Sequence, residues 1–302
     1  MPEFESCLDA CIEKAPYVNI WLQFLGWDVA SNCDYICQRE ITAWRESIGL
    51  EVVQFHGKWP FIRVFGIQEL FSTIFSIGNF IPHYYGFKLM YNRYRKSSGE
   101  QAVLYSGYVG VTLASMGAWF FSTIFHLKDT WNRERLDYFF AGLTVLCGFH
   151  VVFIRIFQLH LKQNTFKRIL FSLICALMYI YHVTRLMNDW SYTYNMQANV
   201  FIGILQYISW FYISFSYYIK LRDTQKSFLQ NIKDREVLWA LKPFLCVCWI
   251  ASGMMFEMFD FSPWFDLIDA HAMWHLVTIW PVGSLYKWIV EDIERLSRDK
   301  LL

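Results

Sequence analysis

The chain has 302 residues, of which 55% are hydrophobic and 20% are aromatic. This composition is too apolar for an ordinary soluble domain, and it indicates an integral membrane protein. The formal net charge is only +1, so no broad basic field indicates nucleic acid as a partner. Seven spans of about 20 residues would use about half of the chain, which excludes a large soluble domain.

The first sixty residues differ from the rest because they mix polar and apolar positions and contain two pairs of cysteines. Cys7 and Cys11 are four residues apart, as are Cys33 and Cys37, so each pair would share one face of a short helix. Disulfides would stabilise so small a segment in an oxidising lumen, whereas a four-thiolate zinc site usually has closer spacing. The sequence leaves all three pairings open; an antiparallel helical hairpin favours Cys7 with Cys37 and Cys11 with Cys33. We expect residues 1–61 to form a lumenal cap.

Seven long apolar stretches follow the cap, separated by short polar segments. They cover residues 63–91, 102–126, 137–159, 168–188, 194–219, 237–258 and 266–289. Each is long enough to cross a hydrocarbon core of about 30 Å as a helix, in which the backbone polar groups are bonded internally. The sequence therefore predicts an all-α integral membrane fold, a seven-transmembrane helix bundle with a small disulfide-linked N-terminal cap.

Lysine and arginine in the short connections predict the orientation in the membrane. One set of connections is rich in them: Arg93, Arg95, Lys96, then Lys162, Lys167, Arg168, then Lys220, Arg222, Lys226, Lys233, Arg235, and finally Arg295, Arg298, Lys300. The alternate connections hold only Lys128, Arg133, Arg135 and Arg185. The rich set is expected in the cytosol, which places the N-terminus in the lumen and the C-terminus in the cytosol. We assign the bundle to residues 62–291 and a cytosolic tail to residues 292–302.

A lumenal N-terminus requires a signal sequence, but residues 1–13 contain no apolar core. We expect that a signal peptide preceded this N-terminus and was removed. The sequence contains no Asn-x-Ser/Thr sequon, so glycosylation gives no independent information on orientation.

Ionisable residues at membrane depth are costly, so their positions carry information about function. His126 ends the second apolar stretch, one helical turn after Ser122. Asp137 opens the third stretch across a short polar turn. In the last stretch, His271 and His275 are four residues apart, so both imidazoles point in one direction. The predicted topology brings these five side chains to the lumenal ends of the spans.

Three histidines with an open position are the composition of a catalytic zinc site. Zinc lowers the pKa of bound water to about 7 and polarises a carbonyl, which suits hydrolysis. In this interpretation His126, His271 and His275 bind zinc, Asp137 transfers the proton and Ser122 stabilises the oxyanion. A lone histidine at the end of a span is more often an interfacial polar group or a packing hydrogen bond. Spacing alone leaves both interpretations open.

The five residues resemble the pattern of a superfamily of seven-span hydrolases that includes alkaline ceramidases and adiponectin-receptor-like proteins (CREST). Its members share a Ser and a His four residues apart, an Asp after a short loop and a late His-x-x-x-His. Within it, the chain resembles the post-GPI-attachment lipid-remodelling phospholipase family (Per1-like) over nearly its whole length. The paired N-terminal cysteines carry this resemblance, together with Gln54–Phe61, Trp119–His126, Leu136–Phe139, Tyr194–Met196, Ala198–Val200 and Leu267–His275. It implies a zinc-dependent GPI phospholipase A2 that removes the sn-2 acyl chain of GPI anchors in the ER or Golgi membrane.

Two other functions stay open on the sequence. A ceramidase-like hydrolase would cleave an amide at the same site, and a seven-span lipid-sensing receptor would need only a ligand pocket and a cytosolic partner surface. Four acidic residues have several candidate functions: Glu69, Glu257, Asp260 and Asp269 are placed to bind substrate, orient a zinc-binding histidine or cap a helix. We favour Asp269 as the residue that orients a histidine.

Overall fold

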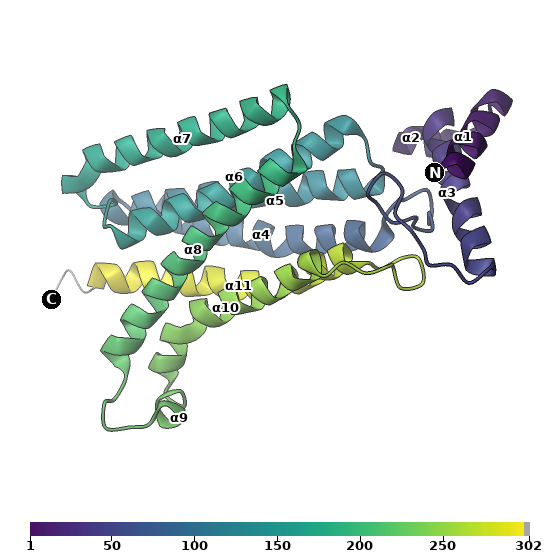
Figure 1. Cartoon of the computed structure of the whole chain (residues 1–302). Helices are drawn as coiled ribbons and strands as arrows, with labels where there is room; N and C mark the ends of the chain where they lie inside the picture. The colour runs from purple at the N-terminus through teal and green to yellow at the C-terminus, as the bar shows by residue number, and fades with distance from the viewer. Residues whose placement is uncertain (299–302) are drawn as a thin grey trace.

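The computed structural model describes residues 1–298, which form an all-helical fold, so part of the predicted tail (299–302) lies outside the described residues. Three short helices make a cap at one end of a bundle of long helices, as Figure 1 shows. The cap helices are α1 (Pro2–Lys14), α2 (Ile20–Leu25) and α3 (Val29–Ser47). The last helix of the bundle ends at the opposite end from the cap.

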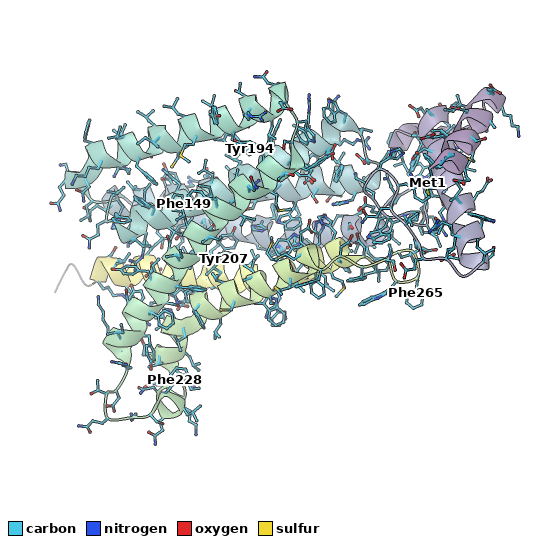
Figure 2. The ribbon with its side chains drawn as sticks, in the orientation of Figure 1. Met1, Phe149, Tyr194, Tyr207, Phe228 and Phe265 are labelled. Atoms are coloured by element: carbon cyan, nitrogen blue, oxygen red, sulfur yellow. A yellow bond between two sulfur atoms is a disulfide. The ribbon has the colours of Figure 1, made fainter. Side chains whose placement is uncertain are left out.

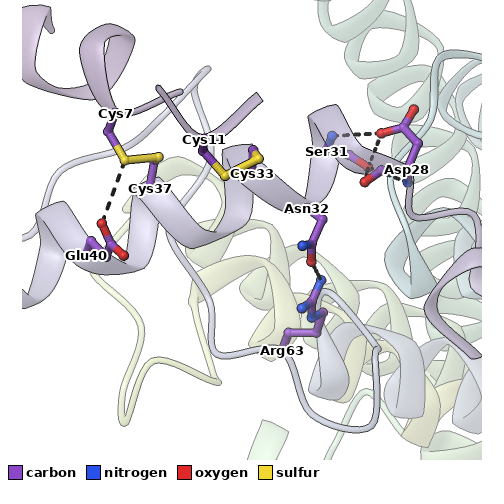
Figure 3. The surroundings of a disulfide bond; sticks show 9 residues. All are labelled: Cys7, Cys11, Asp28, Ser31, Asn32, Cys33, Cys37, Glu40 and Arg63. Atoms are coloured by element: carbon purple, nitrogen blue, oxygen red, sulfur yellow. Dashed lines mark hydrogen bonds between the residues drawn. A yellow bond between two sulfur atoms is a disulfide. The ribbon is translucent and has the colours of Figure 1, made fainter. Parts of the chain in front are cut away.

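The cap is an antiparallel helical hairpin held by two disulfides. Helix α1 packs on α3, and the pairs are Cys7–Cys37 and Cys11–Cys33, which confirms the pairing that a hairpin favours (Figure 3). Asp28 caps the start of α3 by accepting a hydrogen bond from the backbone N–H of Ser31. The hydrophobic contacts of the hairpin involve few side chains, so the crosslinks supply stability that so small a core lacks.

Each predicted apolar stretch corresponds to one long helix. These helices are α4 (Leu70–Lys96), α5 (Gly99–Leu127), α6 (Trp131–Ile156), α7 (Thr165–Asn188), α8 (Tyr192–Leu221), α10 (Arg235–Met258) and α11 (Ala270–Arg298). A 3-10 turn (Lys162–Asn164) precedes α7, and the short helix α9 (Phe228–Asn231) lies between α8 and α10. Helix α4, the first of the bundle, begins at Leu70 rather than at residue 63, because Val64 and Ile67 pair across a tight turn before it.

Among the described residues, five helices are long and apolar enough to cross a membrane, namely α5, α6, α7 with its preceding turn, α8 and α10. Helices α4 and α11 are long enough but carry more polar residues. On α4 the polar residues are buried inside the bundle and the isoleucines face outward: Ser72, Thr73, Ser76, Asn79 and His83 are buried, whereas Ile74, Ile77 and Ile81 are exposed. This pattern is the reverse of a water-soluble amphipathic helix and suits a helix whose outer face contacts lipid.

Helix α4 packs between α5 and α11, and α11 also packs against α10. In the half of the bundle farthest from the cap, a large apolar core includes Met90, Val152, Trp288 and Ile293. Within it, Arg155 of α6 donates to both carboxylate oxygens of Asp292 of α11, at 2.9 and 2.8 Å. This ion pair joins α6 to α11 in that half of the bundle. The buried polar groups near the start of α4 lie in the other half, next to the cap.

The cap is attached to the bundle by polar contacts. Arg39 of α3 pairs with Asp266 in the loop before α11, at 2.7 Å, and Lys58 pairs with Asp129 in the loop before α6. Burial alone would lower the pKa of the Lys58 ammonium, but the carboxylates of Asp129 and Glu69 outweigh it and raise that pKa. The ammonium is therefore charged at neutral pH, and the ion pair holds the cap over the ends of α5 and α6.

Candidate metal centre

Three histidines from two helices meet at the cap end of the bundle. One ring nitrogen of each of His126, His271 and His275 lies within 4.8 Å of those of the other two. The centroid of the His126 ring is 5.2 Å from that of His271 and 5.1 Å from that of His275. The convergence predicted from the sequence is therefore present in the structure, with His126 contributed by α5 and His271 and His275 by α11.

Two of the three rings are oriented by glutamates. The Nδ1 of His126 lies 2.7 Å from Oε2 of Glu69, and the Nδ1 of His271 lies 2.8 Å from Oε2 of Glu257. An ionised carboxylate only accepts hydrogen bonds, so Nδ1 donates in both contacts and the Nε2 of the neutral ring keeps its lone pair. A carboxylate on the far nitrogen is the usual support of a metal-binding histidine.

The third ring is oriented by serine. The Nδ1 of His275 lies 3.0 Å from Oγ of Ser76 and 3.3 Å from the carbonyl oxygen of Ser72, both on α4. The Ser76 hydroxyl donates to the same carbonyl, so its oxygen accepts from the imidazole. All three Nδ1 atoms are thus engaged by protein, and the three Nε2 atoms are the free donors of electron pairs.

The donor set fits a metal ion that prefers imidazole. The Nε2 atom of His126 is buried and has no hydrogen-bond partner among residues 1–298, and its side chain is only 2% exposed. A buried polar atom without a partner is costly unless a ligand satisfies it. The side chain of His271 is 37% exposed, so the cluster is open on that side. Three imidazoles with one open side match a catalytic zinc site better than a closed structural one.

Ser122 and Asp137 lie beside the histidines. Ser122 is buried on α5, and its Oγ is 3.0 Å from Oγ of Ser76, which links it to His275. The Asp137 carboxyl of α6 is within electrostatic range of His126 and His271. The five residues singled out in the sequence therefore gather in one region, although Ser122 and Asp137 make no hydrogen bond to a histidine among the contacts of the described residues.

The structure adds residues that the sequence did not single out or assigned differently. We favoured Asp269 to orient a histidine, but its carboxylate instead caps α11 by accepting from the N–H of Ala272 at 2.8 Å. Glu69 and Glu257 occupy the orienting positions. Ser76 was missed; its signal was the helical spacing of polar residues along α4, which marks a buried polar face.

The electrostatics of Glu69 agree with this arrangement. Burial alone would raise the pKa of Glu69, which precedes the first turn of α4, but His126 and Lys58 hold it below its usual value. The carboxylate is therefore ionised and accepts the hydrogen bond of His126. Lys58 of the cap also lies over the ring of Phe125, 4.4 Å from its centroid, so the cap contributes a positive charge near the site.

Most of the chain resembles proteins of one known family. Residues 19–293 match the Per1-like family. Protein PER1 of Saccharomyces cerevisiae is 44% identical over 90% of this chain and 79% of its own length. Post-GPI attachment to proteins factor 3 of Drosophila melanogaster is 33% identical over 90% of this chain and 77% of its own length.

A third relative, the GPI-specific phospholipase A2-like PGAP3 of Xenopus tropicalis, is 32% identical over 90% of this chain and 79% of its own length. No solved structure matches the chain. The family match spans Cys33 and Cys37 of the cap and all three histidines. The chain therefore belongs to the Per1-like family.

Proposed function

We propose that this protein is a zinc-dependent hydrolase of membrane lipids that removes the sn-2 acyl chain from GPI anchors. The observation that carries the proposal is the convergence of three buried or partly buried imidazoles whose Nδ1 atoms are all engaged by Glu69, Glu257 and Ser76. Three imidazoles held in fixed orientation through Nδ1 form a preorganised ligand set once each Nε2 is deprotonated. A receptor pocket would not require this arrangement.

His126, His271 and His275 would hold the zinc ion. When bound, zinc supplies a Lewis acid that polarises an ester carbonyl and makes a water nucleophile available near neutral pH. The protein's own contribution is to fix the rings: Glu69 and Glu257 accept from Nδ1, which sets the tautomer and raises the basicity of Nε2. The open side at His271 leaves room for a substrate.

Asp137 and Ser122 would complete the chemistry. Asp137 is within electrostatic range of two of the histidines and is the proton carrier from the attacking water to the leaving alkoxide. Ser122 would donate its hydroxyl hydrogen to the oxyanion that develops on the ester carbonyl. In the structure this hydroxyl contacts Ser76, and it would exchange that partner for the substrate oxygen.

The substrate class rests on the family and on the position of the site. The names of two relatives refer to GPI attachment and to a GPI-specific phospholipase A2-like activity. The site lies at the end of helices that are long and apolar enough to cross a membrane, where glycerolipid esters are found. We propose that α4 and α11 also cross, giving seven spans, with the cap in the lumen of the ER or Golgi and the tail in the cytosol. Two disulfides support an oxidising compartment for the cap.

The proposal is tested in cells from which the gene has been deleted. The gene is then returned in three forms: the natural sequence, the His271→Ala variant and the His150→Ala variant. Mass spectrometry of GPI lipids should show loss of the remodelled species with His271→Ala and recovery with the natural chain. His150 of α6 contacts Ser172 rather than the cluster, so His150→Ala should also restore remodelling. Unchanged GPI lipids in the cells without the protein would refute the function.

A further inference from the structure

Three tight turns at the cap end of the molecule have similar tips, and the third is one residue longer than the other two. Their bridges pair Phe55 with Lys58, Val64 with Ile67, and Trp264 with Ile268. Each turn carries residues with positive φ at its tip: His56 and Gly57 in the first, Phe65 and Gly66 in the second, and Phe265 and Asp266 in the third. A left-handed backbone is unfavourable for a residue with a bulky side chain, so two of these tips hold a phenylalanine in a conformation that phenylalanine rarely adopts.

The two phenylalanine tips are almost fully exposed. The exposed fraction is 81% for Phe65 and 88% for Phe265, and Figure 2 shows Phe265 on the outside of the loop at the cap end. In water, the exposed apolar ring would contribute no favourable free energy to offset the strain of the turn. The two rings therefore need an apolar environment outside the protein.

Helix α2 and the segment before it add more exposed apolar side chains beside the Phe65 tip. Tyr17, Ile20, Trp21 and Phe24 are exposed, and no charged residue occurs between Ala15 and Trp27. The Nε1 of Trp21 donates to the carbonyl oxygen of Phe65 at 2.8 Å, which ties α2 to the tip. We call Tyr17, Ile20, Trp21, Phe24, Phe65, Trp264 and Phe265 the aromatic collar.

The collar lies at the level where the long helices begin. Phe65 precedes the first residue of α4 by five positions, and Phe265 precedes the first residue of α11 by the same number. The N–H of Ile62 bonds the carbonyl of Asp266 at 2.9 Å, which joins the two segments. The N–H of Glu69 bonds the carbonyl of His126 at 3.1 Å, so these segments meet the last turn of α5, a candidate membrane span.

The charged residues at the two phenylalanine turns have partners within the protein. Asp266 pairs with Arg39, and the guanidinium of Arg63 lies over the rings of Trp27 and Tyr35, at 4.4 and 4.2 Å from their centroids. A protein-binding surface would normally present charges around its apolar centre. Tryptophan, tyrosine and phenylalanine without free charges are instead typical of the membrane–water interface.

We propose that the aromatic collar is seated in the interfacial region of the lipid leaflet at the cap end of the bundle. The occupant of this surface is lipid, which can contact α2 and the α10–α11 loop at once although they rest on different helices of the bundle. The turn at His56 is the contrast: it has the same backbone, but its side chain is polar and bonds Asp34 at 3.0 Å. It faces water.

Photo-crosslinking of the purified chain in phosphatidylcholine vesicles tests the collar. Benzoyl-phenylalanine is introduced in place of Phe65, Phe24 or Phe265, and in place of His56 as the control with the same turn. After illumination, mass spectrometry should show a shift by one phospholipid mass for the three collar positions and none above background for His56. Protection of the four cap cysteines from alkylation verifies that each variant is folded.

The proposal is overturned if Phe65 and Phe265 give no lipid adduct in folded protein. Crosslinking of either position to a second copy of the chain would also overturn it, because the surface would then be a contact between copies. A lipid adduct at His56 equal to those at the collar positions would contradict the assignment of that turn to water. None of these results depends on hydrolysis, so the collar can fail while the proposed function stands.

Discussion

The Nδ1 of His126 lies 2.7 Å from Oε2 of Glu69, and both side chains are buried. Glu69 comes from the residue before α4 and His126 from the last turn of α5, so the pair joins the two helices at the site. Through this contact, a residue distant in sequence controls which nitrogen of His126 is free. If the cluster binds a metal as proposed, its affinity depends on how α4 packs on α5.

Glu69→Gln should lower the affinity for zinc about tenfold to a hundredfold, because the amide cannot stabilise the ring as a carboxylate does. Zinc retained after equilibration with graded chelator measures the effect. Glu236→Gln removes a glutamate that pairs with Arg295 at the far end of the bundle and serves as the control. Equal zinc retention in Glu69→Gln and the natural chain would show that Glu69 has no part in metal binding.

Ser122→Ala should reduce lipid hydrolysis about a hundredfold to a thousandfold, the usual loss when one oxyanion donor is removed, while zinc content stays the same. Thr123→Val is the matched control, because the Thr123 hydroxyl bonds only the backbone carbonyl of Trp119 among the side-chain contacts of the described residues. A fluorophosphonate probe that labels Ser122 covalently would contradict the role of a donor and make Ser122 the nucleophile.

The cap cysteines should react with maleimide only after reduction. In denatured, unreduced protein we expect labelling of the four free cysteines, Cys147, Cys175, Cys246 and Cys248, and after reduction labelling of all eight. The double change Cys7→Ser and Cys37→Ser should destabilise the cap by about 2–5 kcal/mol, which lowers yield more than the activity of the folded fraction. Eight labels before reduction would contradict the disulfides.

Asp292→Asn should destabilise the bundle by about 3–5 kcal/mol, because it leaves the Arg155 guanidinium buried without its carboxylate. Thermal unfolding in detergent measures the loss. The combined change Arg155→Met and Asp292→Leu removes both charges and should recover most of the stability. If Asp292→Asn unfolded at the same temperature as the natural chain, the ion pair would contribute nothing to holding α6 against α11.

The lengths and positions of the apolar stretches predicted most of the fold. The seven stretches are seven helices, because a long run of apolar residues leaves a backbone few alternatives in lipid. The start of α4 was misplaced because the turn at Phe65 and Gly66 uses positive φ at a phenylalanine, which sequence rules for turns do not predict. The crossing of the membrane by α4 and α11 stays a prediction, because their buried polar residues lower the mean hydropathy of both helices and leave them outside the five candidate spans.

The sequence predicted the three histidines of the site but not the residues that orient their rings. His126, His271 and His275 could be found because topology assigns each to one depth, and depth follows from span boundaries. The partners of the rings could not, because Glu69, Glu257 and Ser76 are selected by the rotation of each helix about its axis. Asp269 lies closer in sequence to His271 than Glu257 does, yet its position at the start of α11 commits it to the helix cap.

The most direct measurement of the proposed function uses the purified chain reconstituted in vesicles that contain a diacyl GPI lipid with different acyl chains at sn-1 and sn-2. Released fatty acid is identified by mass spectrometry before chelation, after chelation and after return of zinc. We expect release of the sn-2 acid alone, its loss on chelation and its recovery with zinc. Release that continues without metal, or release of the sn-1 acid, would contradict a zinc-dependent phospholipase A2.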